Sequence, residues 1–199
     1  MAGIIQQYQE RRLAQRMASG ERRAFEEFVD QYGGRLHRLA RSYARTESDA
    51  EDLTQDILVE ISRSIGSFRG SSTLATWIYR VALNRCLKHR ERQRPDTAPI
   101  ETVTAAVSLE TGPAQCAERS ELKERIETAL SQLSEDHRQV VILHEMHGLT
   151  YSECAEALGV PVGTVKSRLF NAFRRLRTSL GGYVLGEENL FPGAATETS

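Results

Sequence analysis

The segment from residue 149 to residue 180 carries basic side chains in a pattern suited to binding DNA. A helix fits the major groove, and cations along it pair with phosphates or with guanine edges. No acidic residue lies between positions 166 and 177. We therefore predict a DNA contact here, in preference to a structural helical hairpin with a solvated basic face. The cations are Lys166, Arg168, Arg174, Arg175 and Arg177.

The residues before these cations predict a helix-turn-helix. Thr150 followed by Glu153 forms a capping box, in which each side chain satisfies a backbone N–H at the start of a short helix. Gly159 is suited to the left-handed conformation that ends this helix, and Pro161 fixes the turn. Thr164 then lies near the start of the second helix, which carries the cations.

The net charge of −1 hides an uneven distribution of charge along the chain. Residues 46–60 hold six acidic residues and no cation, whereas residues 69–94 hold seven basic residues against Glu91 alone. Together with the carboxy-terminal cations, this gives two basic patches and one acidic helix. The pattern predicts two DNA contacts and one further partner.

Other chemistry is disfavoured by the same residues. A metal-dependent nuclease also uses clustered carboxylates, but here the acids fall within one helix and no second element supplies more. His144 and His147 have no third ligand at a suitable spacing, so we expect structural or solvent-facing roles and neither a metal nor a cofactor. The odd cysteine count predicts no disulfide framework; Cys116, in a linker, is a candidate exposed thiol. The cysteines are Cys86, Cys116 and Cys154.

Composition and periodicity predict an all-α protein of two small helical domains. The chain has 199 residues, 40% hydrophobic and 27% charged, and lacks the run of about 18 to 20 apolar residues that a membrane span needs. Its amino-terminal segment lacks a signal-peptide core, so we expect a cytoplasmic location without membrane insertion.

Apolar residues at helical spacing place the individual helices. They predict a helix over 24–43, a second that opens at a Ser48–Glu51 capping box, and a third that starts near Thr73 and ends before Pro95. Residues 95–119 read as a flexible linker and 181–199 as a disordered tail. Between them, further helices form the second domain, with Ser134 as an N-cap.

Three motifs occur in order along the chain: DAEDLTQDILVEI, FRGSSTLATWIYRVALNR and SQLSEDHRQVVILHEMHGLTYSECAEALGVPVGTVKSRLFNAFRRLR. Together they resemble sigma factors of the sigma-70 family, specifically the short extracytoplasmic-function (ECF) group. The match runs from about residue 25 to residue 176, interrupted only by the linker. The resemblance implies a subunit that gives core RNA polymerase its promoter preference, with no catalysis and no small-molecule substrate. An anti-sigma factor that clamps between the domains is a further expected partner.

The resemblance implies one role for each part of the chain. Residues 1–94 would dock on polymerase and would recognise and melt the minus-ten element, and residues 120–180 would read the minus-thirty-five element. The expected polymerase-binding residues are Asp52, Gln55, Asp56 and Glu60. The expected minus-ten residues are Phe68, Arg69, Ser71, Ser72, Trp77, Arg80, Asn84, Arg85 and Lys88; for Trp77 a core role is as plausible as a wedge. The expected minus-thirty-five residues are Thr164, Lys166, Ser167, Phe170, Asn171 and Arg174.

Some positions depart from the family pattern, and two other functions stay open. Leu58 and Leu74 stand where aromatic residues are common, and Ser134 stands where proline is frequent. Asn171 stands where arginine is frequent on the recognition helix, so the minus-thirty-five sequence of relatives does not carry over to this chain. A stand-alone helix-turn-helix regulator would need a dimer interface that the sequence does not show. A module that only sequesters a partner would tolerate charge reversal at Lys166. The sequence leaves open the promoter, the inducing signal, the anti-sigma factor and the role of the tail.

Overall fold

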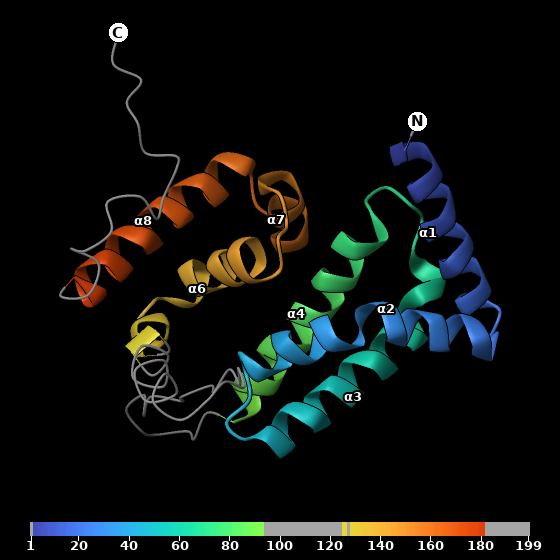
Figure 1. Cartoon of the computed structure of the whole chain (residues 1–199), viewed down its shortest axis with the longest axis horizontal. Helices are drawn as coiled ribbons and strands as arrows, with labels where there is room; N and C mark the ends of the chain where they lie inside the picture. Colours follow the sequence, from blue (N-terminus) through green and yellow to red (C-terminus); the bar gives the residue numbers. More distant parts are fainter. Residues whose placement is uncertain (1, 94–124, 127, 182–199) are drawn as a thin grey trace, which may run out of the picture.

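The computed structural model describes residues 2–93, 125–126 and 128–181, and every regular element in these ranges is a helix (Figure 1). The predicted all-α fold class is confirmed. The predicted linker at 95–119, with Cys116, lies outside the described residues, as does the tail after residue 181. No described helix combines the length and the apolar composition that crossing a membrane requires.

The first half of the chain is a bundle of four α-helices. Helices α1 (Ala2–Ala18), α2 (Arg22–Arg41), α3 (Glu47–Ser64) and α4 (Leu74–Arg92) occur in that order, and a short 3-10 helix, η1 (Ile65–Ser67), precedes α4. Helices α2, α3 and α4 each bury an apolar stripe in the core of this bundle, because their apolar residues recur three or four positions apart. Fully buried core residues include Phe28, Leu36, Leu39, Leu53, Ile57, Ile61, Leu74 and Ile78.

Helix α3 starts at a different cap from the one that the sequence predicts. The hydroxyl of Thr46 accepts from the Asp49 N–H, and the Asp49 carboxylate accepts from the Arg45 N–H at 2.9 Å. The helix is already formed at Ser48, so the predicted Ser48–Glu51 box is wrong. Two T/S-x-x-D/E patterns overlap in this stretch, and the earlier one forms the cap, so the helix begins two residues before its predicted start.

The second half contains the helix-turn-helix. Residues 128–131 are helical, and α6 (Glu135–Val141) runs into a π-helical turn, η2 (Ile142–Met146). Helices α7 (Tyr151–Leu158) and α8 (Val162–Leu180) follow. Ser134 is the N-cap of α6, as predicted, but its hydroxyl bonds the His137 ring instead of a backbone N–H.

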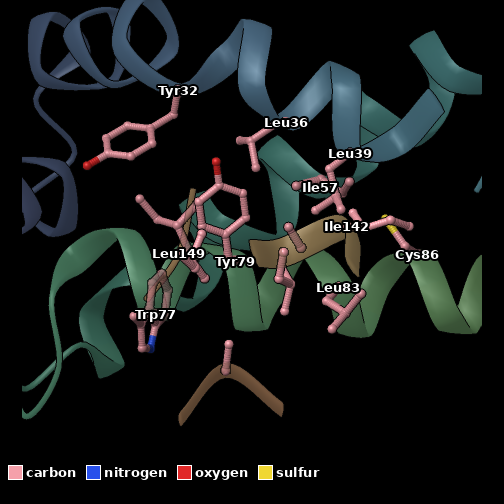
Figure 2. Close-up of a cluster of buried hydrophobic side chains, with 14 of the residues drawn as sticks. Tyr32, Leu36, Leu39, Ile57, Trp77, Tyr79, Leu83, Cys86, Ile142 and Leu149 are labelled. Carbon is pink, nitrogen blue, oxygen red and sulfur yellow. The ribbon is translucent and has the colours of Figure 1, made fainter. Parts of the chain in front are cut away.

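The two halves pack against each other through α4 and α7 (Figure 1). The Tyr79 hydroxyl lies 3.2 Å from Nδ1 of His147, and the two rings are 5.0 Å apart. Figure 2 shows Tyr79 in one buried apolar cluster that includes Leu83 and Cys86 of α4 and Ile142 and Leu149 of the second half. Helix α4 therefore has two apolar faces, one for its own bundle and one for the other domain.

Polar contacts surround this shared core. The Arg138 guanidinium donates to the Ser42 carbonyl at 2.7 Å and lies 4.9 Å from the centre of the Tyr43 ring. Arg90 of α4 forms an ion pair with Glu135 at the start of α6. The contacts of Arg138 join α6 to the end of α2, and the Arg90 pair joins it to α4.

Burial at the junction keeps His147 neutral. Burial, together with the positive charges of Arg38 and Arg35 on α2, lowers the pKa of His147 to about 4. The Nε2 atom of His147 is buried and has no hydrogen-bond partner among the described residues. Protonation would therefore place a charge in an apolar, cationic environment.

Candidate nucleic-acid interface

The turn between α7 and α8 is built as its sequence predicts. The Thr150 hydroxyl accepts from the Glu153 N–H, and the Glu153 carboxylate accepts from the Thr150 N–H at 2.9 Å. Gly159 ends the helix with φ of +66°, and the Val160 N–H donates to the Ala155 carbonyl at 3.0 Å. This pair of features is a Schellman cap, and it turns the chain sharply into α8.

Helix α8 divides cleanly into a buried and an exposed face. Val165, Leu169 and Ala172 are buried, and α8 packs on α6 and α7. Of the predicted minus-thirty-five residues, Thr164 and Asn171 are half-buried at the edges of the helix face. The others are exposed on the opposite face: Lys166, Ser167, Phe170 and Arg174.

Phe170 is the most informative residue on this exposed face. Its side chain is 66% exposed, although it is a large apolar group in the middle of a helix. Lys166 and Arg174 lie one turn to either side of it, at i−4 and i+4. An apolar side chain flanked by cations suits a major groove, where it contacts a thymine methyl while the cations contact phosphates.

The role of one neighbour of α8, Tyr151, was not predicted from the sequence. Tyr151 is 41% exposed, and its ring lies at a tilt to the His144 ring with 4.6 Å between centroids. The Lys166 ammonium lies 5.8 Å from the centre of the Tyr151 ring. This ring therefore helps to orient Lys166. Arg168, by contrast, forms an ion pair with Asp136 at 2.5 Å, so its charge is used within the domain. Tyr151 follows its cap directly in the sequence, but only the fold brings it to Lys166.

A shallow hollow of about 250 Å³ lies between the end of α3 and one face of α4. Its volume is below the range of about 300–1,000 Å³ typical of pockets that enclose drug-sized ligands, so it suits one small group. Five of the nine residues predicted for the minus-ten element line it together. These are Trp77, Arg80, Asn84, Arg85 and Lys88, and the remaining lining comes from Glu60, Ser64, Ser67 and Val81.

The loop before α4 supplies the other predicted minus-ten residues. Phe68 is half-buried and meets Trp77 edge-on, with ring centres 5.9 Å apart. Arg69 and Ser71 are exposed, and Ser72 is half-buried. Trp77 itself is only 5% exposed, so it forms part of a wall of the hollow rather than a projecting wedge.

The acidic face of α3 is exposed, as expected for a surface that docks on a partner. It holds an apolar residue that sequence reasoning missed: Val59, which is 46% exposed. A patch with an apolar centre and a charged rim is the usual form of a protein interface. The pattern was readable in the sequence, since Val59 lies three and four positions after two predicted residues. The predicted residues Asp52, Gln55, Asp56 and Glu60 are all exposed around it.

This acidic face is connected to the hollow. Asp56 forms an ion pair with Arg85 of α4, and Glu60 lines the hollow while remaining exposed on α3. The two surfaces therefore share an edge. Any partner seated on α3 lies directly beside whatever the hollow binds.

The described residues include no cluster of three or more histidine, cysteine or acidic side chains arranged to hold a metal ion. His144 bonds the Leu149 carbonyl at 2.6 Å, and His147 contacts Tyr79, so both have structural contacts. Cys86 and Cys154 are buried, and burial raises the pKa of the Cys154 thiol to about 12. These thiols are packing groups, not nucleophiles.

Comparison with known proteins identifies the family. Residues 28–95 match the family described as sigma-70 region 2, and residues 123–176 match the family described as sigma-70 region 4. The RNA polymerase sigma-H factor of Pseudomonas aeruginosa is 33% identical over 179 residues, which cover 85% of this chain and 92% of the relative. The ECF RNA polymerase sigma factor SigM of Mycobacterium tuberculosis is 35% identical over 164 residues, 82% of this chain and 80% of that one. The chain belongs to the ECF group of the sigma-70 family.

Solved structures of sigma factors share the fold. CnrH, solved in complex with the cytosolic domain of CnrY, has a TM-score of 0.68 at 27% identity, over 87% of this chain and 98% of that one. The sigma factor RpoE of Bartonella quintana, solved with the anti-sigma factor NepR, has a TM-score of 0.63 at 28% identity, over 79% and 96%. As a sigma factor, the chain binds core RNA polymerase and directs promoter-specific transcription initiation.

Proposed function

We propose that this sigma factor reads its promoter with two separate surfaces, one in each half of the molecule, while core polymerase holds both on the DNA. The observation that carries the proposal is the presence of two exposed basic surfaces, each within a segment that matches one sigma-70 region. Two weak contacts held at a fixed separation combine their affinities, so neither needs to bind tightly alone. In this function the chain catalyses no step of its own. It acts together with polymerase in the cytoplasm.

In the minus-ten element, the hollow between α3 and α4 receives one base extruded from the non-template strand. Trp77, backed by the Phe68 ring, supplies an aromatic wall, and Arg80 and Asn84 are placed to hydrogen-bond the base edge. Lys88 lies further along α4 and contacts phosphates. Arg85 lines the hollow beside it and is paired with Asp56 of α3. Arg69, Ser71 and Ser72 belong to the loop that closes one side of the base site.

In the minus-thirty-five element, the exposed face of α8 enters the major groove. Phe170 provides an apolar contact with a base edge, and Ser167 is placed for a hydrogen bond there. Lys166 and Arg174 contact the phosphates on either side and give affinity with a steep dependence on salt. Thr164 and Asn171 contact bases only at the edge of this face, since each is half-buried.

The exposed face of α3 docks on polymerase. Val59 forms the apolar centre of the contact, and Asp52 and Gln55 pair with cations of the partner around it. Asp56 lies at the side of this contact, where it is paired with Arg85 of α4. Glu60 lies at the boundary between this contact and the hollow. The shared edge couples docking on polymerase to capture of the minus-ten base.

The two halves must separate when both elements are read. Helix α7 packs on both α4 and α8, and packed helices lie about 8–10 Å apart, so α4 and α8 approach within about 20 Å. Elements centred about 25 base pairs apart lie on the order of 85 Å apart along B-form DNA, at about 3.4 Å per base pair. The packed arrangement is therefore a resting form. We propose that an anti-sigma partner, such as the one bound to RpoE of Bartonella quintana, holds this form.

Transcription with purified components tests the proposal. The full chain is mixed with core polymerase and a pool of genomic promoter fragments, and the transcripts are sequenced. Start sites that share a two-part upstream motif would support it; core binding with start sites that share only one element would contradict it. Charge reversal at Lys166 and Arg174 should abolish these transcripts. Arg23→Glu, an exposed change on α2, is the matched control and should leave them unchanged.

A further inference from the structure

Helix α1 lies before the segment that matches sigma-70 region 2, and it packs directly on the minus-ten side of the bundle. It contacts η1, α2 and α4, and buries Leu13, Ala14 and Met17 against them. These three side chains anchor the helix. The polar side chains just before them reach a different target, the loop between η1 and α4.

Two adjacent residues of α1 bind this loop, one at Gly70 and the other where the loop enters α4 at Leu74. The Arg11 guanidinium donates to the Gly70 carbonyl at 2.9 Å, and the Glu10 carboxylate accepts from the Leu74 N–H at 2.9 Å. The Leu74 N–H is one of the donors at the start of α4 that have no partner within the helix. The Thr73 hydroxyl accepts from the Thr76 N–H, so the start of α4 has two caps from different parts of the chain.

The backbone at Gly70 is shaped around the Arg11 side chain. Gly70 has a φ of +71°, and a Cβ added there would lie 2.4 Å from Nε of Arg11. Only glycine accommodates both the conformation and the close approach. The loop residues between the two contacts are Ser71, Ser72 and Thr73, of which Ser71 is exposed. The loop begins at Phe68, whose ring meets Trp77 in the wall of the hollow.

We propose that Glu10 and Arg11 are positioning residues for promoter melting, which hold loop 70–73 in the conformation that captures the extruded minus-ten base. The proposal rests on the function proposed above for the hollow. A base pocket discriminates only when it is rigid before the base arrives, because an ordered loop does not lose conformational entropy on binding. Glu10 and Arg11 supply that rigidity from outside the two sigma-70 segments.

The alternative is that α1 only stabilises the bundle, and the test separates the two. Holoenzyme is assembled from core polymerase and the full chain carrying Arg11→Ala, Arg11→Lys, Glu10→Ala or Glu10→Gln. Arg12→Ala, an exposed change one position along the same helix, is the matched control. The probes are a fork DNA with a single-stranded non-template minus-ten element, the same fork with an abasic site at each position in turn, and a duplex minus-thirty-five element.

Arg11→Ala and Glu10→Ala should each weaken binding to the intact fork about tenfold, the effect of one lost hydrogen bond to a charged group. Binding to the fork whose abasic site removes the captured base should change little. Discrimination between the intact fork and this abasic fork should therefore fall by the same factor. Arg11→Lys retains a hydrogen-bond donor and Glu10→Gln retains an acceptor, so each should recover part of the lost discrimination. Core affinity and duplex binding should stay unchanged, as should all values for Arg12→Ala.

Three results would overturn the proposal. Unchanged discrimination in both alanine variants would remove the positioning role. An equal loss on all probes and on core affinity would show that α1 merely stabilises the fold. If the wild-type holoenzyme did not distinguish the intact fork from any abasic fork, the hollow would not capture a base. That result would contradict the proposed function on which this inference rests.

Discussion

Acidification should open the contact between the two halves of this sigma factor through one residue, His147. Its pKa is about 4 in the packed form, against an ordinary value of 6.5, because it is buried and faces Arg38 and Arg35. A depressed pKa contributes stability that is present above 6.5 and is lost as pH falls toward 4. Tyr79 of α4 covers the His147 ring, so separation of the halves restores its hydration.

The size of the effect follows from the two pKa values. At about pH 5.5 the separated form is favoured by about one pKa unit relative to neutral pH, which is about 1.4 kcal/mol, or tenfold in the equilibrium. The packed form is not yet protonated there, because its own pKa lies well below. His147→Gln removes the titrating group while keeping a polar side chain near the Tyr79 hydroxyl.

Fluorescence energy transfer measures this equilibrium. Labels are placed on cysteines introduced at Ser62 and Arg177, which are exposed on α3 and α8. Cys116 is replaced by serine, and Cys86 is replaced by alanine because it lies in the contact between the halves and separation would expose it. Cys154 is buried, so it labels poorly. The ratio of separated to packed molecules should rise about tenfold between about pH 7.5 and pH 5.5 in wild type, and His147→Gln should lose most of that rise. Equal pH dependence in both proteins would mean that His147 does not control the equilibrium, since their other titrating groups are the same.

Three further predictions concern single side chains. Phe170→Ala should weaken binding of holoenzyme to a duplex minus-thirty-five element about tenfold, because the apolar contact contributes roughly 1–2 kcal/mol. The unfolding temperature should stay unchanged, because the ring is exposed. An unchanged affinity in a filter-binding assay would show that Phe170 does not contact the DNA. Val59→Asp should reduce affinity for core polymerase, measured by fluorescence anisotropy, more than Glu51→Gln does on the same helix, and equal effects would contradict an apolar centre. Glu153→Ala breaks the capping box and should cost about 1 kcal/mol of unfolding free energy in urea titrations, whereas no change would mean that the Thr150 hydroxyl alone caps α7.

Features fixed by local chemistry were predictable from the sequence. The Thr150–Glu153 box, the left-handed Gly159 and the Thr73 cap of α4 all occur as expected, because each depends on residues within one helical turn. The start of α3 was misplaced for the same reason: two local caps compete, and the sequence does not rank them. The gathering of Arg80, Asn84 and Lys88 on one face followed directly from helical spacing.

Features that depend on distant parts of the chain were not predictable. The second apolar face of α4, with Tyr79, Leu83 and Cys86, lacks an obvious purpose until Ile142 and Leu149 pack on it. Helix α1 was missed because charged residues interrupt its apolar positions, and its stability comes from packing on η1 and α4. The contacts of Glu10 and Arg11 span 64 and 59 positions, so no local pattern contains them.

The central claim is that two surfaces of one chain contact two promoter elements in the same polymerase complex. Site-specific photocross-linking tests it most directly, with a photoreactive amino acid placed at Asn84 in one protein and at Phe170 in another. In the initiation complex, we expect cross-links to two separate patches about 25 base pairs apart, with the Asn84 patch on the non-template strand near the start site. Cross-links from both positions to one patch, or from Phe170 to no DNA, would contradict the account.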